Sequence, residues 1–363
     1  MTVLGGTVLL AAAMIIAVLF GALRGDEALL SVAGVATPTP LGGSAGAGSP
    51  FELYFTDPDS PNADTLRGGP DAALVEAIEG ARFSVDLAAY DLDLWSLRDA
   101  LIAAHERGVS VRIVAESDSL DEPEMQELLD AEIPILGDRR EALMHNKFAV
   151  IDHQQVWSGS MNFTVRGAYR NNNNLIAVQS SRLAQNFLAE FDEMFLEDQF
   201  GPGSPADTPY QVVEVDGRQI EVYFSPDDGT AARLLELIRG AQESIHFLAF
   251  SFTSDDLAEA LIDQTRAGLA VSGVVEESQA NTNQGAEYAR LRSAGVDVHF
   301  DGNPANMHHK VIIIDEKIVV TGSYNFSASA EKRNDENTLI IHDPQLAAAF
   351  MEEFGRIYAQ AQP

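Results

Sequence analysis

Two stretches of the chain repeat the same pattern of polar residues. The first reads MHNKFAVID at residues 144–152 and continues with GSMN at residues 159–162. The second reads MHHKVIIID at residues 307–315 and continues with GSYN at residues 322–325. Both follow H-x-K-x4-D-x6-G-S-x-N without a gap. Because six fixed positions match by chance only about 10⁻⁸ times per starting position, the chain contains two copies of one unit.

The repeat extends over the surrounding sequence. Each copy begins with an extended stretch, continues with an amphipathic helix that ends at glycine, and then alternates strands and helices. This order predicts an α/β fold in which each copy forms a mixed β-sheet flanked by helices. A pseudo-twofold axis then relates two tandem halves, so a shared site lies on the axis and the chain is a monomer with an internal pseudo-dimer. The matching segments are 52–55 and 221–224, 73–80 and 233–240, 83–90 and 244–250, and 109–116 and 269–277.

Two breaks in composition divide the chain. Residues 34–50 form an uncharged Gly/Pro/Ala/Ser/Thr tract, which is typical of a flexible linker. A second Gly/Pro-rich break occupies residues 201–209. We therefore predict a membrane anchor or signal segment at 1–33, a linker at 34–50, and two catalytic domains at 51–200 and 210–363.

The N-terminal segment is apolar for the length of a membrane span. Residues 3–23 carry no charge and are followed by Arg24. As a helix they would extend about 31 Å, enough to cross a bilayer. Since no Lys or Arg precedes the run, an uncleaved transmembrane anchor is favoured over a cleaved signal. We expect catalytic domains anchored to a membrane and facing away from the cytoplasm, or secreted if the segment is cleaved.

The overall charge restricts the binding partners. Asp and Glu outnumber Lys and Arg by 55 to 23, a formal net charge of −32. Such a surface disfavours general coating of DNA or RNA, because that binding needs cations on the phosphates. Nucleic acid stays possible only as a substrate. The chain has no cysteine, which excludes thiolate chemistry, and two of its four lysines stand in the repeated motifs.

The spacing of each motif predicts a chemical site. In a strand, residues i and i+2 point to the same face, so His145 and Lys147 project together, as do His308 and Lys310. Ser160 with Asn162, and Ser323 with Asn325, would repeat this arrangement on the next strand. Imidazole supplies a nucleophile or a general acid, and the cations and amides stabilise phosphoryl oxygens.

No carboxylate or thiolate set in the motifs suits magnesium or zinc. We therefore predict metal-independent phosphoryl transfer without a cofactor. His309 neighbours His308, but it would point to the opposite face and have a structural or surface role.

The paired motifs resemble those of the phospholipase D superfamily, and the resemblance covers the chain from about residue 51 to its end. It implies a phosphohistidine intermediate, with His145 as the nucleophile and His308 as the acid. By the same resemblance, the catalytic set consists of His145, Lys147, Asp152, His308, Lys310, Asp315 and Glu336. Asp152 and Asp315 would be structural supports at the strand ends, and Ser160, Asn162, Ser323 and Asn325 would bind phosphate.

One family feature distinguishes the two copies. A downstream Glu that hydrogen-bonds the histidine is matched by Glu336 in the second copy, whereas the first copy has Asn173 at that position. We expect Glu336 to lie beside His308 and to raise its proton affinity, which suits an acid.

Three functions stay open. The favoured one is hydrolysis or head-group exchange of a phospholipid, as in phospholipase D. The alternatives are a metal-independent endonuclease of the same superfamily and a non-catalytic membrane-tethered scaffold. The sequence does not specify the head group, or whether water or an alcohol is the acceptor.

Overall fold

The computed structural model describes residues 50–361. These residues belong to one compact unit, Thr37–Pro363. The segment predicted to cross the membrane, residues 3–23, and most of the predicted linker lie outside the described residues. Among the residues that are described, no helix combines the length and apolar character needed to cross a bilayer.

The first half forms a seven-stranded mixed sheet in the order β1-β7-β6-β5-β2-β3-β4. Strands β2, β3 and β4 are parallel, whereas β5, β6, β7 and β1 join by antiparallel pairing. The elements of this half are β1 (Phe51–Phe55), α2 (Pro61–Thr65), α3 (Pro70–Glu79), β2 (Ser84–Ala89), α4 (Trp95–Glu106), β3 (Ser110–Ala115), η1 (Ser117–Ser119), α5 (Pro123–Asp130), β4 (Ile135–Gly137), β5 (Lys147–Ile151), β6 (Gln155–Gly159), α6 (Val165–Tyr169), β7 (Asn174–Gln179) and α7 (Ser181–Glu197).

The second half repeats this sheet and adds one strand at its edge. Its order is β12-β11-β10-β13-β14-β15-β9-β8. The elements are η2 (Gly201–Gly203), β8 (Val212–Val215), β9 (Arg218–Ser225), α8 (Thr230–Gly240), β10 (Ser244–Ala249), α9 (Asp255–Ala267), β11 (Ala270–Val275), α10 (Glu277–Thr282), α11 (Tyr288–Ser293), β12 (Asp297–Phe300), β13 (Lys310–Ile314), β14 (Ile318–Gly322), α12 (Ala328–Lys332), β15 (Glu336–His342) and α13 (Pro344–Gln360). The predicted two-copy α/β fold is therefore confirmed for the described residues.

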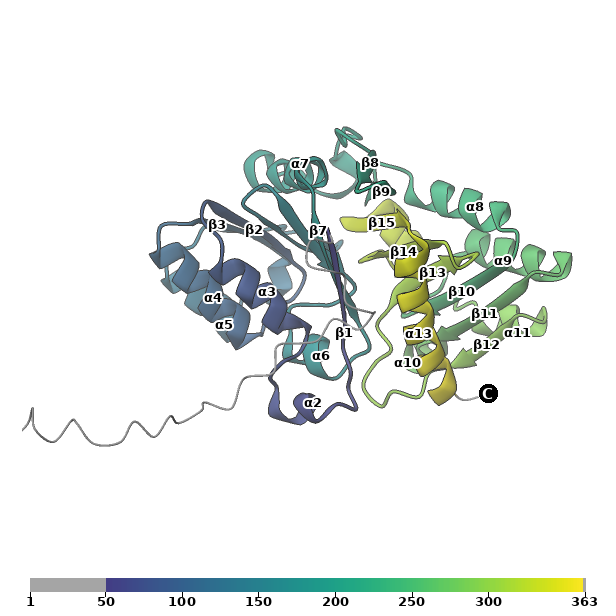
Figure 1. Ribbon diagram of the computed structural model, residues 1–363. Coiled ribbons are helices and arrows are strands. Elements are labelled where there is room, and N and C mark those ends of the chain that lie inside the picture. Colours follow the sequence, from purple (N-terminus) through teal and green to yellow (C-terminus); the bar gives the residue numbers. More distant parts are fainter. Residues whose placement is uncertain (1–49, 362–363) are drawn as a thin grey trace, which may run out of the picture. The chain divides into compact units, whose positions relative to one another are not determined.

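Each sheet is covered by helices on its outer face. Helices α3, α4 and α5 pack on the first sheet, and α8, α9 and α11 pack on the second (Figure 1). The longer helices α7 and α13 are preceded by the capping residues Ser180 and Asp343, whose side chains accept hydrogen bonds from the first-turn amides. Such capping satisfies donors that have no partner within the helix.

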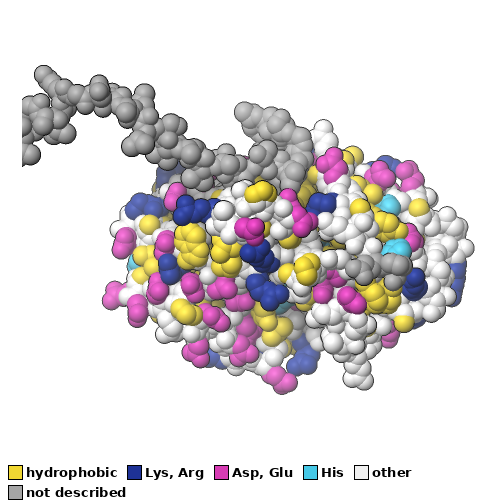
Figure 2. Space-filling view, turned by 90° about the horizontal axis from the view of Figure 1, so that it is seen from below, with side chains coloured by type: hydrophobic (Ala, Val, Ile, Leu, Met, Phe, Trp, Pro, Cys, Tyr) yellow, Lys and Arg dark blue, Asp and Glu magenta, His cyan; other side chains and the backbone are white. Residues whose placement is uncertain are grey.

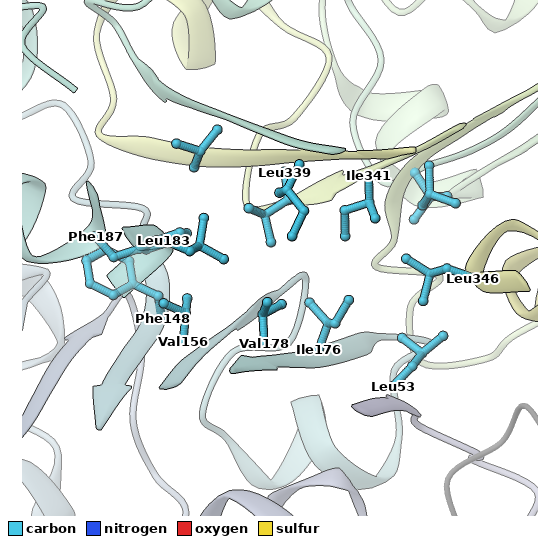
Figure 3. Packing of buried hydrophobic residues seen from close by; sticks show 14 of the residues in the cluster. Leu53, Phe148, Val156, Ile176, Val178, Leu183, Phe187, Leu339, Ile341 and Leu346 are labelled. Carbon is cyan, nitrogen blue, oxygen red and sulfur yellow. The ribbon is translucent and has the colours of Figure 1, made fainter. Parts of the chain in front are cut away.

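A third apolar cluster joins the two halves. Leu339 and Ile341 on β15 face Ile176 and Val178 on β7 (Figure 3). All four residues are fully buried. Replacing one such side chain with alanine typically costs about 2–5 kcal/mol of folding free energy. The halves are thus held together by a continuous core, and this core places the motif of each half against the other.

Candidate active site

Each motif histidine lies immediately before a central strand of its sheet. His145 precedes β5 and His308 precedes β13, so Lys147 and Lys310 are the first residues of those strands. Each histidine is 6% exposed and each lysine 1% exposed. The prediction that the motif histidines lie within these strands is wrong, since His145 and His308 stand two residues before the strand starts. It is also wrong for the serines and asparagines that follow β6 and β14, namely Ser160, Asn162, Ser323 and Asn325. Gly159 ends β6 because its φ of +151° is rarely adopted by other residues.

Backbone hydrogen bonds tie each histidine to the opposite half. The N–H of His145 donates to the carbonyl of Asp335 at 2.9 Å, and the N–H of His308 donates to the carbonyl of Asn172 at 3.0 Å. The neighbouring Met144 forms a bridge with Asp335 in the parallel sense. The two motifs therefore meet where the halves meet, as the pseudo-twofold prediction requires.

The carboxylate of Glu336 contacts the histidine of the other half. Its Oε2 lies 2.7 Å from Nδ1 of His145, and Ser323 Oγ donates to the same oxygen at 2.6 Å. The prediction that Glu336 would lie beside His308 is therefore wrong. The cause is an exchange across the pseudo-twofold axis, which places the start of β15 against the first motif.

The amide of Asn173 takes the equivalent place beside His308. Nδ1 of His308 lies 3.0 Å from Asn173 Oδ1 and 3.1 Å from the carbonyl oxygen of Ser160. Since a carbonyl can only accept, Nδ1 carries the proton and Nε2 is left for chemistry. Lys310 Nζ lies 3.1 Å from this Nε2. Ser160 Oγ donates to Asn173 at 2.9 Å, as Ser323 does to Glu336.

The two lysines are buried without a carboxylate in direct contact. Lys147 Nζ donates to the carbonyl of His145 at 2.7 Å, and Lys310 Nζ donates to that of His308 at 2.8 Å. No ion pair joins either lysine to a carboxylate within the described part of the chain. Burial lowers the pKa of Lys147 to about 7, although the charge of Glu336 opposes this shift. Burial and the charge of Lys147 hold the pKa of Lys310 well below its usual value.

These shifts describe a pocket that is removed from water, in which the charge of Glu336 only partly offsets the cost of burying two lysines. Burial and both lysine charges lower the pKa of His145 and of His308. The charge of His145 also contributes to the shift of His308, so the four groups share one site. Burial raises the pKa of Glu336 to about 7, while Lys147 opposes the change. A bound phosphodiester anion would compensate the two ammonium groups.

Aromatic rings from both halves form the walls of the site. The ring of Tyr90 meets the His145 ring edge-on at 4.7 Å, and Lys147 Nζ lies 4.8 Å from its centre. Phe250 repeats this arrangement at 4.4 Å from the His308 ring and 4.7 Å from Lys310 Nζ. Neither ring was predicted from the sequence, although each directly follows a strand, β2 or β10, at an equivalent position of the repeat.

The motif aspartates lie away from this pocket and support its strands. Asp152 accepts hydrogen bonds from the backbone N–H groups of residues 82–84, and Asp315 does the same for residues 242–244. Burial alone would raise the pKa of each carboxyl, but these donors hold both below the usual value. These contacts support the structural role that the resemblance implies, and membership of both aspartates in the catalytic set stays a prediction.

The predicted phosphate ligands divide into two groups. Ser160 and Ser323 use their hydroxyls to hold Asn173 and Glu336, so their contact with phosphate stays a prediction. Asn162 and Asn325 each have a buried side-chain oxygen without a hydrogen-bond partner in the described residues. Because each unpaired atom is an acceptor, whereas phosphoryl oxygens need donors, binding of phosphate by these two amides also stays a prediction.

Of the structural or surface role predicted for His309, the contacts of this residue, which lies just before β13, support the structural one. Its ring is fully buried, accepts from Asn174 at 3.0 Å and donates to Glu353 at 3.1 Å. The residue that the sequence analysis undervalued is Asn173, which was noted only as a departure from Glu. Within residues 50–361, no group of three His, Cys, Asp or Glu side chains is arranged to hold a metal ion.

Comparison with known proteins identifies the repeated unit. The family described as "Cardiolipin synthase, PLD-like domain" matches residues 74–195 and 234–358, once in each half. Phospholipase D of Rickettsia typhi is 34% identical over 145 residues, which are 40% of this chain and 71% of that protein. Mitochondrial cardiolipin hydrolase of Xenopus laevis is 36% identical over 136 residues, which are 38% of this chain and 64% of that protein.

A solved structure repeats the fold of both halves. Phosphatidylserine synthase of Haemophilus influenzae Rd KW20 superimposes with a TM-score of 0.65 at 14% identity, covering 85% of this chain and 87% of that one. The two family matches, the relatives and the paired motifs agree with one another. The chain therefore belongs to the phospholipase D superfamily and is a phosphodiesterase with one PLD-like unit in each half.

Proposed function

We propose that the protein hydrolyses a phosphodiester without a metal ion, through a covalent phosphohistidine. The observation that carries this proposal is the joint burial of two histidines and two lysines from opposite halves. Each imidazole has its Nδ1 tied to an acceptor, which leaves Nε2 for the reaction. The two lysines lack a direct counter-ion, and a phosphodiester monoanion supplies one.

The reaction proceeds in two steps. Nε2 of His145 attacks phosphorus while the bond to the leaving oxygen breaks, and the protonated Nε2 of His308 gives its proton to that oxygen. His308 then takes a proton from water as the water oxygen attacks phosphorus and releases His145. An acceptor alcohol in place of water would give head-group exchange. Lys147, Lys310 and the Asn162 and Asn325 amides stabilise the charge on the phosphoryl oxygens.

The position of Glu336 supports His145 as the nucleophile. When Nε2 is bonded to phosphorus and Nδ1 keeps its proton, the ring carries a positive charge. The Glu336 carboxylate, 2.7 Å from Nδ1, stabilises that charge throughout the life of the intermediate. His308 faces only neutral acceptors, so its proton is given up more readily.

A phospholipid is the substrate that the surroundings favour. Acidic side chains are spread over the face in Figure 2, and the chain carries a formal charge of −32. Burial raises the pKa of Tyr90, and the nearby Glu116 and Asp91 add to this shift, so acidic groups also lie near the first-half wall of the pocket. Such a surface repels the extended polyanion of a nucleic acid. The relatives named phospholipase D and cardiolipin hydrolase support the same substrate class.

A membrane location follows from this proposal. The apolar run at residues 3–23 would keep the catalytic halves close to lipid, on the side facing away from the cytoplasm. Fractionation of cells that produce the full chain tests this point. Recovery in the membrane pellet supports the anchor, and a shortened chain in the medium would show cleavage instead.

The decisive experiment compares two substrates in excess EDTA. The full chain is incubated with phospholipid vesicles and, separately, with single-stranded DNA. We expect release of a head group from the vesicles, and loss of this activity in His145→Ala. His153→Asn is the matched control, because His153 lies in the turn after the same motif and its φ of +55° is tolerated by asparagine. Cleavage of DNA alone would establish the nuclease alternative, and restoration only by added metal would refute the mechanism.

A further inference from the structure

Two buried glutamates near the site have no part in the mechanism above. Glu116 follows β3 and Glu276 follows β11, at equivalent positions of the two halves. They are 2% and 3% exposed, and neither forms an ion pair in the described part of the chain. A buried carboxylate without a cation is costly, so its hydrogen bonds show what it stabilises.

Both carboxylates hold the peptide that leads into a motif histidine. Glu116 Oε2 accepts the backbone N–H of Met144 at 2.9 Å, and Glu276 Oε2 accepts that of Met307 at 2.7 Å. The other oxygen of Glu276 accepts from Ser278, through its backbone N–H at 3.3 Å and its hydroxyl at 2.8 Å. Each carboxylate thereby links the histidine segment to the loop that follows β3 or β11.

The next peptide along the chain is held from the opposite half. His145 gives its N–H to Asp335, whereas Met144 gives its N–H to Glu116 in its own half. Two consecutive N–H groups are thus fixed from two directions, and the backbone before the imidazole has little freedom left. Met307 and His308 repeat this arrangement.

We propose that Glu116 and Glu276 are positioning residues, each of which aligns the histidine of its own half for phosphoryl transfer. This inference rests on the proposed function for its catalytic consequence. A second carboxylate supports each glutamate loop, since Asp138 accepts from the N–H of Ser117 and Asp301 from that of Glu277, both at 3.0 Å. Burial and the neighbouring Asp138 raise the pKa of Glu116 to about 7.

The test replaces each glutamate with glutamine, which has the same size but only one accepting oxygen. We expect kcat to fall by about 10- to 100-fold with KM nearly unchanged, because misplacement of a reacting group affects the chemical step. Glu122→Gln is the control, because Glu122 is exposed and makes no side-chain cap.

The two substitutions should also differ in how they affect different substrates, because one acts on the nucleophile and the other on the acid. Glu276→Gln should slow alkyl esters more than p-nitrophenyl esters, whereas Glu116→Gln should slow both equally.

A measurement that needs no activity separates this inference from the proposed function. The chain has eight histidines, so ¹⁵N-histidine labelling of the full chain gives a small set of imidazole signals. Glu116→Gln should shift the signals of His145 and leave those of His308 in place, and Glu276→Gln should do the reverse. Unchanged imidazole signals with wild-type kcat would overturn the inference. Equal disturbance of both histidines with a lowered melting temperature would overturn it too, by showing a general structural role.

Discussion

Nδ1 of His145 lies 2.7 Å from Oε2 of Glu336, although 191 residues separate them in the chain. The bond crosses between the halves, and the bond from His308 to Asn173 crosses in the other direction over 135 residues. Neither half therefore contains a complete site. Each half supplies the histidine of one pair and the side chain that orients the histidine of the other pair. The two pairs also differ in charge, since one partner is a carboxylate and the other is an amide.

This difference predicts distinct roles for the histidines. In His308→Ala, hydrolysis of an alkyl or choline ester should fall by about 10²- to 10⁴-fold, because the leaving alcohol needs a proton. A p-nitrophenyl ester should lose far less, since its phenolate leaves without one. Mass spectrometry after rapid quenching should find the phosphoryl adduct on His145. An adduct on His308 would reverse the assignment.

Replacing Glu336 should change the pH dependence of the reaction. The His145–Glu336 pair takes up a proton near pH 7, because burial raises the pKa of Glu336 to about 7, and the rate falls when the pair is protonated. In Glu336→Gln only the imidazole can titrate, and burial and both lysines lower its pKa. The low-pH limb of kcat/KM should therefore move to lower pH by about 1 unit, while the plateau falls.

Asn173→Asp is the matched variant for this test. It places a carboxylate beside His308, whose pKa should rise, so the high-pH limb should move upward because the acid stays protonated longer. A profile that moves in the same direction for both variants would contradict the assigned roles.

Binding of an anion should draw a proton into the pocket. Burial lowers the pKa of Lys147 to about 7, so much of this lysine is neutral at pH 8. A bound anion favours the ammonium form and raises that pKa. Titration calorimetry with sulfate at pH 8, in Tris and in HEPES, should show buffer-dependent heats that correspond to proton uptake. The uptake should shrink in Lys147→Met and persist in Lys317→Met, whose lysine is exposed. Identical heats in the two buffers would contradict the prediction.

The motif aspartates should affect stability rather than turnover. Asp152→Asn loses acceptor capacity for the amides of residues 82–84, which should lower the free energy of unfolding by about 1–2 kcal/mol with little change in kcat. The folded-state pKa of Asp152 is lowered, so its contribution exists above the unfolded pKa of about 3.9 and is lost below it. Urea unfolding at pH 7 and pH 3 should show this difference shrinking. Asp130→Asn, at an exposed helix end, is the control, and a large loss of kcat in Asp152→Asn would contradict the structural role.

The sequence by itself determined the features that depend on local spacing. The two copies, the order of strands and helices, and the pairing of His145 with Lys147 follow from residues that lie close together along the chain. The α/β fold could therefore be predicted before the structure was known. The motif residues could be singled out by their repetition, and their roles in the reaction stay predictions. The supporting role of Asp152 was implied by the family resemblance instead, since its partners at residues 82–84 are distant in the sequence.

Only the tertiary structure decided which half completes which histidine. Glu336 and Asn173 occupy equivalent places in two similar copies. Their distance along the chain from a motif histidine does not reveal whether each contacts the histidine of its own half or that of the other half. The packing of β7 against β15 selects the exchanged arrangement, in which Glu336 contacts His145 and not His308. The low pKa of Lys147 likewise required the structure, because it arises from burial between halves that are distant in sequence.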